Sequence, residues 1–464
     1  MFVYKSRLYH FKEGLMLNNI ISKRTLIISI LTMAMPAIIE MALNTMLGLA
    51  DTIMISRFIG DSALSAAGFA NSIMFTLIFV FTSFNTGATA LVSRSYGEEN
   101  FDKLNRTGSQ TVLLNGIIGF VIMTLSLIFS KQIFMIFDTT PEVSIMIQIY
   151  FPIVAYGMLA MFLSFSFASI LRGAGDTVSP MVITGIANVI NIIGNYVLIK
   201  GIWIFPEMGI AGAALSTTIS RTIAVIAYIF ICFRLHERVK LKLVLMKFEK
   251  EILKPLMRIS LPGALEQALM QTSFLAVGII ISKLETTSEA AFRILINIES
   301  ISFMPAVGIS IAAATLVGKS LGEKNKEHAY DVGSVSYGLA IAWGFIAGLV
   351  FFIFRRPILQ IFTTDLQVIE SSMFTMILMA VNQPLLNFMI GISGGLRGAG
   401  DTKNVMMITI MRLWLVFVPL SYATIIWMEF GVAGLWIAEI ISFAIFNAVI
   451  MKRFRSKKWT EIHV

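Results

Sequence analysis

Cysteine is nearly absent from this chain, since Cys232 is the only one among its 464 residues. A single thiol excludes a disulfide framework and a metal site built from several thiolates. Charge is also scarce, because Asp, Glu, Lys and Arg make up 14% of the residues, against about 25% in an average soluble domain. This composition excludes a disordered protein, and it leaves too few basic residues on any one surface for binding nucleic acid.

Histidine is almost as rare, and all four histidines lie in polar segments of the sequence. They are His10, His236, His328 and His463. The sequence also has no Gly-rich phosphate-binding loop ending in Lys, which a nucleotide hydrolase of that class requires. We therefore expect a protein that is not an enzyme and that carries no cofactor.

Apolar residues are abundant instead. They make up 57% of the chain, against roughly 45–50% in soluble domains, and the mean hydropathy is +0.82. Apolar stretches of about twenty residues return along the whole chain, which is the length that crosses a bilayer as a helix. The predicted fold is an all-α membrane protein with twelve transmembrane helices, at 26–56, 62–86, 109–130, 144–169, 178–199, 209–233, 254–282, 289–316, 333–354, 368–394, 404–427 and 431–451.

The basic residues predict the orientation of these helices. The loops on the side of the N-terminus hold 27 of the 36 Lys and Arg residues, and the loops on the opposite side hold 6. Because cytosolic loops are the ones enriched in Lys and Arg, we expect both termini in the cytosol and the protein in the inner (plasma) membrane.

An internal repeat divides the chain into two halves. Residues 171–177 return letter for letter as residues 396–402, and residues 95–100 correspond at the same spacing to residues 320–325. Because six is an even number, both copies of a six-helix repeat cross the membrane in the same orientation. We therefore expect two six-helix lobes related by a pseudo-two-fold axis along the membrane normal. The predicted segments are a cytosolic arm 1–25, an N-lobe 26–233, a cytosolic linker 234–253, a C-lobe 254–451 and a cytosolic tail 452–464.

The repeated seven-residue motif is typical of a hinge loop between two helices. Four glycines suit left-handed turns at helix ends, acidic and hydroxyl residues suit N-caps, and one arginine in each copy suits a cytosolic flank. These residues are Gly173, Gly175, Gly398 and Gly400, then Asp176, Thr177, Asp401 and Thr402, and finally Arg172 and Arg397.

Polar residues inside the spans form two stripes. At 100° per residue, Glu40, Asn44 and Asp51 share one face of the first helix. The fifth helix carries a second stripe, made of Thr184, Asn188, Asn191 and Asn195. A carboxylate in hydrocarbon costs about 2.5–3.5 kcal/mol, so these faces are expected to point into protein or a water-filled cavity. Contacts between helices are the alternative explanation.

The second half lacks both stripes. Val277 stands at the position of Asp51, and Leu413, Val416 and Leu420 stand at those of the three asparagines. We therefore predict a cation site confined to the N-lobe, with Asp51 as the carboxylate and Asn188, Asn191 and Asn195 beside it. If Na⁺ is the ion, Asp51, Asn191 and Asn195 are the expected ligands. The expected cavity and gating residues are Glu40, Asn44, Glu266 and Pro36.

The chain resembles the multidrug and toxic compound extrusion family, MATE, along nearly its whole length, and it is most similar to its DinF-like and NorM-like bacterial members. The resemblance rests on residues 50–52, on residues 298–305 and on the doubled seven-residue motif. It implies export of drugs and organic cations in exchange for H⁺ or Na⁺. It also places Asp51, Asn191, Asn195 and Thr217 on positions of the family's N-lobe cation site.

Two departures from that family pattern bear on the ion. Members often carry an aspartate where this chain has Asn195, so the site holds one negative charge, and because burial favours a protonated carboxyl, H⁺ and Na⁺ both remain open. In the C-lobe, Met270 replaces an expected acid of the seventh helix, and the tenth helix offers only amides, Asn382, Gln383 and Asn387. We therefore do not expect the family's C-lobe cation site.

Three arginines, Arg221, Arg293 and Arg412, fall inside predicted spans and need partners there. Glu299 and Glu439 are available acids, and the sequence does not say which pairs form. We expect these arginines to form structural contacts that hold neighbouring helices together.

Multidrug export by a monomer in the lipid bilayer is the function that the sequence favours, because the acids of the first helix would attract amphipathic, often cationic compounds. The alternative is a flippase for a lipid-linked saccharide, whose anionic headgroup would require cavity arginines.

Overall fold

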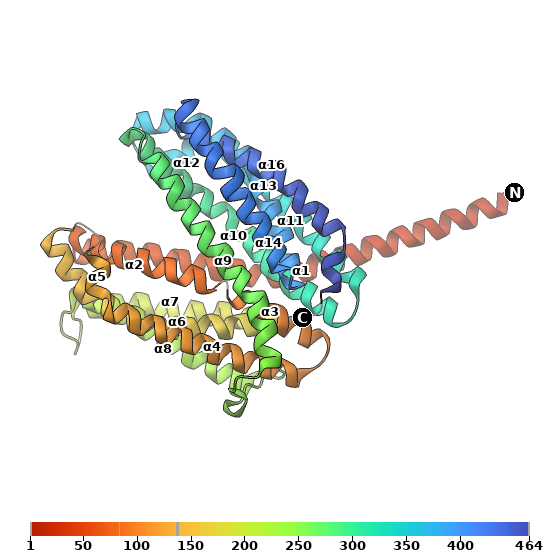
Figure 1. Ribbon diagram of the computed structural model, residues 1–464, viewed down its shortest axis with the longest axis horizontal. Coiled ribbons are helices and arrows are strands. Elements are labelled where there is room, and N and C mark those ends of the chain that lie inside the picture. The colour runs from red at the N-terminus through yellow and green to blue at the C-terminus, as the bar shows by residue number, and fades with distance from the viewer. Residues whose placement is uncertain (1, 83, 136–138, 463–464) are drawn as a thin grey trace.

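A computed structural model of the chain describes residues 2–82, 84–135 and 139–462, and every regular element in these ranges is helical (Figure 1). The first half contains α1 (Phe2–Phe58), α2 (Asp61–Thr82), α3 (Asn85–Gly97), α4 (Phe101–Ile128), α5 (Ser130–Phe134), α6 (Pro141–Gly173), α7 (Val178–Lys200), α8 (Gly209–Phe230) and the π-helical turn η1 (Ile231–Leu235). The second half contains the 3₁₀ turn η2 (Leu243–Leu245), α9 (Lys250–Ile281), α10 (Thr286–Gly322), α11 (Lys326–Ile353), α12 (Arg355–Phe362), α13 (Leu366–Gly398), α14 (Thr402–Met411), the π turn η3 (Arg412–Phe417), α15 (Val418–Tyr422), the π turn η4 (Ala423–Trp427), α16 (Ala433–Arg455) and the 3₁₀ turn η5 (Lys458–Glu461).

Eleven helical runs in these ranges are long and apolar enough to cross a membrane. With α2, which lies where the sequence predicts the second span, they account for the twelve expected helices. Several helices run past the predicted ends. α3 and α4 are separated only by residues 98–100, because the Asn100 side chain accepts a hydrogen bond from the Lys103 amide and starts α4 at once.

The eleventh predicted span, 404–427, is not one continuous α-helix. It consists of α14, η3, α15 and η4, so that two π-helical turns flank a short α-helical segment. Pro419 lies in the first turn of that segment, and because proline has no N–H it cannot donate the regular hydrogen bond of an α-helix. The break therefore occurs where the ordinary hydrogen-bond ladder is interrupted.

The two halves form two lobes that meet at the end carrying the C-terminus and diverge toward the other end (Figure 1). In the N-lobe, α6 packs against α2, α4 and α8, and in the C-lobe α13 packs against α10, α11 and α16. Equivalent helices therefore take equivalent places, which confirms the predicted two-lobe architecture.

α1 contacts both lobes. Its early residues Leu26, Ile30 and Ala34 belong to the apolar core of the C-lobe, together with residues of α10 and α13. Ile55, near its end, belongs to the N-lobe core. Pro36 lies between these two parts, so the helix leaves one lobe and enters the other near its proline.

α9 makes the reciprocal crossing. Leu256 and Ile259 pack with residues of α3, whereas Val277 and Ile280 lie in the C-lobe core. Pro262 stands between the two parts, as Pro36 does in α1. The first segment of each repeat therefore packs against the opposite lobe, although the sequence alone places each helix within its own half.

Glycines close the contact between the lobes where α3 crosses α10. A Cβ on Gly97 would collide with the carbonyl oxygen of Lys319, and a Cβ on Gly322 would collide with that of Arg94. Only glycine allows the two backbones to come this close. We call this crossing of α3 and α10 the seam.

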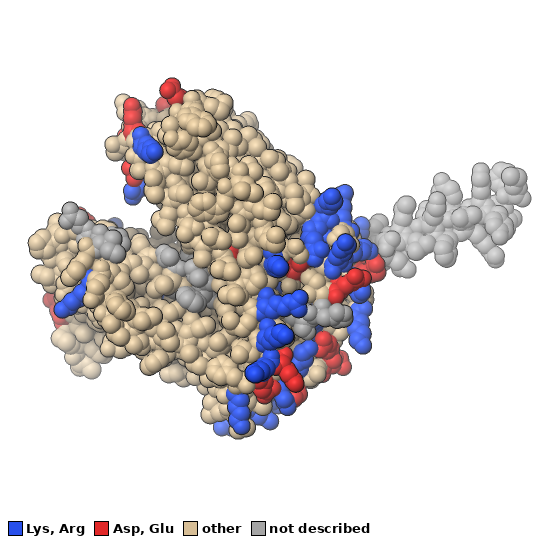
Figure 2. Space-filling view, in the orientation of Figure 1, with Lys and Arg blue, Asp and Glu red and all other residues tan. Residues whose placement is uncertain are grey.

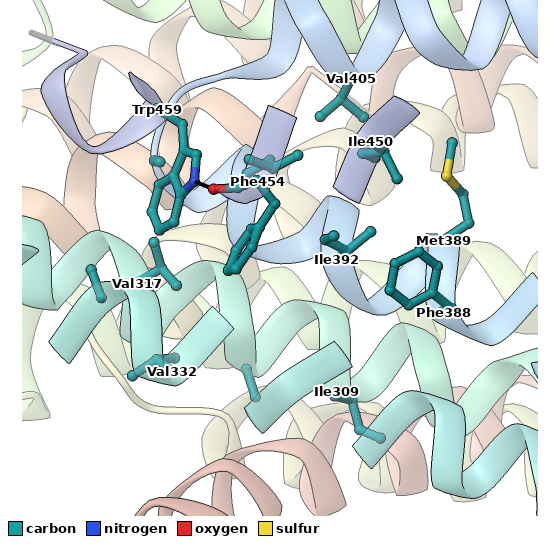
Figure 3. Close-up of a cluster of buried hydrophobic side chains, with 14 of the residues drawn as sticks. Ile309, Val317, Val332, Phe388, Met389, Ile392, Val405, Ile450, Phe454 and Trp459 are labelled. Carbon is teal, nitrogen blue, oxygen red and sulfur yellow. Dashed lines mark hydrogen bonds between the residues drawn. The ribbon is translucent and has the colours of Figure 1, made fainter. Parts of the chain in front are cut away.

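The predicted tail packs onto the C-lobe. α16 continues to Arg455, and the fully buried Trp459 stacks on Phe454, with ring centroids 5.1 Å apart (Figure 3). The Trp459 indole N–H donates to the Phe454 carbonyl oxygen over 2.8 Å. Residues 463–464 of the predicted tail lie outside the described residues.

Candidate functional site

A cavity of about 710 Å³ lies in the N-lobe, on the side that faces the C-lobe. Its wall comes from α1, α2, α3, α6, α7 and α8, and α10 and α13 of the other lobe close one side. Figure 2 shows the cleft between the lobes that widens away from the C-terminal end. Among the residues predicted from the sequence, Glu40, Asn44, Asp51, Asn188, Asn191 and Thr217 line this cavity.

Asp51 is at the centre of a hydrogen-bond network between α1, α7 and α8. Asn195 donates from its side-chain nitrogen to Asp51 Oδ1 over 2.5 Å. In the amide orientation that satisfies both of its ends, Asn191 donates to the same oxygen over 2.9 Å and accepts from the Thr217 hydroxyl over 3.2 Å. The structure therefore brings together the four residues that the resemblance placed in one site.

Among the described residues, Asp51 forms no ion pair, so the negative charge of this network has no counter-ion at hydrogen-bond distance. Arg221 lines the same cavity and acts electrostatically on Asp51 and on the buried Tyr150. Its guanidinium donates to the Met161 sulfur over 2.9 Å. Asn195 Oδ1 is buried and has no hydrogen-bond partner. An unused acceptor oxygen beside a carboxylate is a suitable ligand for a cation.

The other members of the two stripes have different contacts. Asn188 donates to the Leu43 carbonyl oxygen over 2.9 Å and so ties α7 to α1 beside the cavity. Asn44 is exposed on the cavity wall. Pro36 is buried where α1 passes between the lobes, one helical turn before Glu40, and it is not among the residues that line the cavity.

Glu40 forms an ion pair that the sequence analysis missed. Arg172, in the repeated motif, donates to Glu40 Oε1 over 2.7 Å, and the Thr184 hydroxyl lies 3.5 Å from the same oxygen. The signal for this pair was available, because an acid predicted to lie inside a span needs a partner and the motif supplies an arginine nearby.

The C-lobe repeats this arrangement. Arg397 donates to Glu266 Oε1 over 2.8 Å, and the Thr409 hydroxyl donates to the same oxygen over 2.8 Å. Glu266 lines a separate small cavity of about 90 Å³, whereas Arg397 lines both cavities. Each motif arginine thus binds the acid of the first helix of its own repeat.

The structure corrects the predicted roles of the motif glycines and caps. Gly175 and Gly400 have φ values of +90° and +86°, as left-handed turns require, but Gly173 and Gly398 do not. A Cβ on Gly398 would collide with the Ala314 carbonyl oxygen, so this glycine serves close helix packing. Thr177 and Asp401 are the N-cap residues of α7 and α14, as the motif predicts, but neither side chain makes a capping hydrogen bond. The Asp176 carboxylate accepts from the Ser179 amide at the start of α7, and Asp401 pairs with Arg453 over 2.7 Å.

The C-lobe has no equivalent of the Asp51 network. Val277 and Leu413, at the positions of Asp51 and Asn188, are buried in its apolar core, and Val416 and Leu420 pack against apolar clusters. This agrees with the predicted asymmetry between the halves. Arg293 differs from expectation, since it is exposed and pairs with Glu289 of its own helix, whereas Arg221 of α8 contacts Met161 of α6 and so joins two helices.

Comparisons with known proteins agree with this architecture. The MatE family model matches residues 36–197 and 262–423, one match in each half. The chain is 30% identical over 431 residues to a protein of Thermotoga maritima named "Probable multidrug resistance protein NorM", covering 93% of this chain and 92% of that one. It is 27% identical to "Uncharacterized transporter YisQ" of Bacillus subtilis, covering 93% and 95%.

Solved structures share the fold. A transporter of the MOP superfamily from Pyrococcus furiosus superposes with a TM-score of 0.85 at 21% identity, covering 94% of this chain and 96% of that one. A mutant of the Vibrio cholerae MATE transporter VcmN superposes with a TM-score of 0.86 at 18% identity, covering 95% and 100%. The family model spans more than half of the chain and the Thermotoga relative spans nearly all of it, so the chain belongs to the MatE family of membrane transporters.

Proposed function

We propose that this protein is a multidrug exporter that exchanges amphipathic, often cationic compounds for H⁺ or Na⁺. The observation that carries the proposal is the Asp51 network on the wall of the N-lobe cavity, which α10 and α13 of the C-lobe close on one side. Names of relatives such as "Probable multidrug resistance protein NorM" support the same substrate class. A volume of about 710 Å³ is in the range that holds drug-sized molecules.

The coupling ion binds at Asp51 in this proposal. Asn195 Oδ1 is a further oxygen of a Na⁺ site, and Asn191 Oδ1 joins it when the Asn191 amide turns toward Asp51. Asp51 alone takes up the ion if it is H⁺. Binding neutralises the only carboxylate among Asp51, Asn191, Asn195 and Thr217. Ion and drug then compete because each has a different affinity for the two states of the cavity.

The proposed orientation places both termini in the cytosol. Lys and Arg gather at the end where the lobes meet, as Figure 2 shows, and cytosolic surfaces of membrane proteins carry this excess. The seam then closes the cytosolic side, and the cavity opens outward. One chain contains the complete cavity, which supports a monomer in the plasma membrane as the working unit.

A second candidate is a flippase for a lipid-linked saccharide. Arg172, Arg221 and Arg397 all line the cavity, which suits an anionic headgroup. Two of them are already paired with Glu40 and Glu266, so their positive charge is largely compensated. This pairing favours the exporter.

The test measures ethidium efflux from proteoliposomes under an imposed Na⁺ gradient or an imposed pH gradient. We expect one gradient to drive efflux in the wild type and Asp51→Asn to abolish the driven part. Asp61→Asn, which removes an exposed carboxylate at the start of α2, is the matched control and should export normally. Driven efflux by Asp51→Asn would contradict the assignment of the ion site, and absence of efflux from the wild type under both gradients would favour the flippase.

A further inference from the structure

A second pair of acids, one buried and one half-buried, lies in the C-lobe, away from the cavity. Glu299 of α10 and Glu439 of α16 both accept hydrogen bonds from the side-chain nitrogen of Asn382 in α13, over 3.4 and 3.0 Å. Gln383 donates to Glu299 over 3.1 Å. Asn382 and Gln383 are completely buried, and Glu299 is 7% exposed. Neither acid is among the residues that line the cavity.

The two carboxyl groups have one basic partner between them. Arg412 of η3 acts electrostatically on Glu439, stacks on the Phe443 ring at 4.0 Å and donates to Ser442 over 3.2 Å. Among the described residues, the other charged group that acts on this set is Glu266 of α9, through its electrostatic effect on Arg412. Glu266 has its own partner in Arg397. Two acids and one arginine leave a single uncompensated negative charge in the core.

Two buried polar atoms of this group have no hydrogen-bond partner. They are Asn382 Oδ1 and Arg412 Nε. Arg412 is 8% exposed, and the completely buried Trp436 interacts with Glu299. Buried polar atoms are rarely left unpaired. Because these unpaired atoms lie beside two acids, we infer that the hydrogen bonds of the site rearrange when the charge of the acids changes.

We propose that Glu299 and Glu439 form a second proton-binding site, which takes up one proton shared by the pair. Two carboxylates that share a buried site cannot both stay ionised at low cost. One proton converts one carboxylate into a carboxylic acid, and Arg412 balances the other. The new O–H requires an acceptor, and Asn382 supplies it when its amide turns and presents the unused Oδ1.

A proton fits this site better than a sodium ion. The groups that point at the carboxylates are the N–H donors of Asn382 and Gln383, whereas Na⁺ requires a shell of oxygens. Gln383 Oε1 is not available, because it already accepts from Ser302 and Asn387. The described residues also contain no cluster of three or more His, Cys, Asp or Glu side chains suited to a metal ion.

The position of the pair connects it to the cavity through one helix. α10 carries Glu299, then Pro305, and then Val307, Ser310, Ile311 and Ala314 on the cavity wall. Proline removes one hydrogen bond of the helix and allows bending at that point. A change of charge at Glu299 therefore acts on the helix that closes the cavity from the C-lobe side.

Infrared difference spectroscopy of the purified protein tests the proposal, since the C=O stretch of a protonated carboxyl is distinct from that of a carboxylate. Wild type should show a carboxylic acid band at neutral pH that is lost at alkaline pH. Glu299→Gln and Glu439→Gln should each lose it, while Glu299→Asp should keep it. Glu289→Gln, an exposed acid of the same helix, is the matched control and should leave the band unchanged.

Two results would overturn the proposal: a wild type without the band, or Gln variants that both keep it at full intensity. The measurement needs neither drug nor ion gradient, so its outcome is independent of the export proposal. Asp51→Asn should retain the band of the pair, which separates this site from the one in the N-lobe.

Discussion

At the scale of single residues, the most informative contacts are the two ion pairs of the repeated motif. Arg172 with Glu40, and Arg397 with Glu266, bind a motif arginine to an acid of the first helix of each repeat. Both acids are buried, with 7% and 5% of their surfaces exposed. A buried pair contributes little when it is complete, but removal of one partner leaves a charge without compensation.

We therefore expect Glu40→Gln to lower the free energy of unfolding by about 3–5 kcal/mol, because the Arg172 guanidinium stays behind without a counter-ion. Thermal unfolding in detergent measures the effect. The double variant Glu40→Gln/Arg172→Gln should recover part of the loss. Glu289→Gln breaks an exposed pair and should change stability by less than about 1 kcal/mol. Equal effects of Glu40→Gln and Glu289→Gln would show that the buried pair has no special role.

Asn195 offers a second residue-scale prediction. Asn195→Asp places a second carboxylate 2.5 Å from Asp51, where the two must share a proton or a cation. We expect this variant to be stabilised against heat by NaCl relative to choline chloride, and by more than the wild type is. Asn188→Asp, whose side chain contacts the Leu43 carbonyl oxygen instead of Asp51, is the control. If NaCl stabilises both variants alike, the effect does not come from the Asp51 network.

At the scale of elements, the seam of α3 and α10 sets how closely the lobes approach. Gly322→Ala should open it, because the added methyl group collides with the Arg94 carbonyl oxygen and overpacking costs about 1–3 kcal/mol. A reporter cysteine at the buried Ser320, in a Cys232→Ala background, should become reactive to a maleimide in this variant. Gly338→Ala, where a Cβ meets nothing within 4 Å, should leave the reporter protected. Protection in both variants would contradict the proposed tight seam.

The sequence was sufficient for much of the element scale and for part of the site. Apolar length predicted the spans and the repeat predicted the lobes, since both depend on residues close together in the chain or copied along it. The stripes predicted that Asp51 and Asn195 face each other across α1 and α7. The partners of Glu299 were out of reach, because they come from helices whose relative rotation only packing determines. The π-helical turns around Pro419 also escaped, since a proline predicts a break but not its form.

At the scale of the whole molecule, the crossing of α1 and α9 makes each lobe depend on the other. The N-terminal part of α1 fills the C-lobe core, and the corresponding part of α9 packs on α3. We expect that a chain cut in the exposed linker, between Leu243 and Val244, yields halves that are degraded when expressed alone and assemble when expressed together. Protease resistance and co-purification measure this. A half that is stable alone would contradict the interdependence of the lobes.

The crossing of α1 and α9 also bears on how the two-lobe chain arose. The two repeats point the same way through the membrane, and each lends the beginning of its first helix to the other. A six-helix ancestor with this packing could not complete its apolar core by itself. It would have worked as a pair of identical subunits that exchanged their first helical segments. Fusion of two gene copies would have preserved this exchange of segments within one chain. Among the described residues of the present chain, the Asp51 network belongs to the first repeat, and apolar residues stand at the same positions of the second.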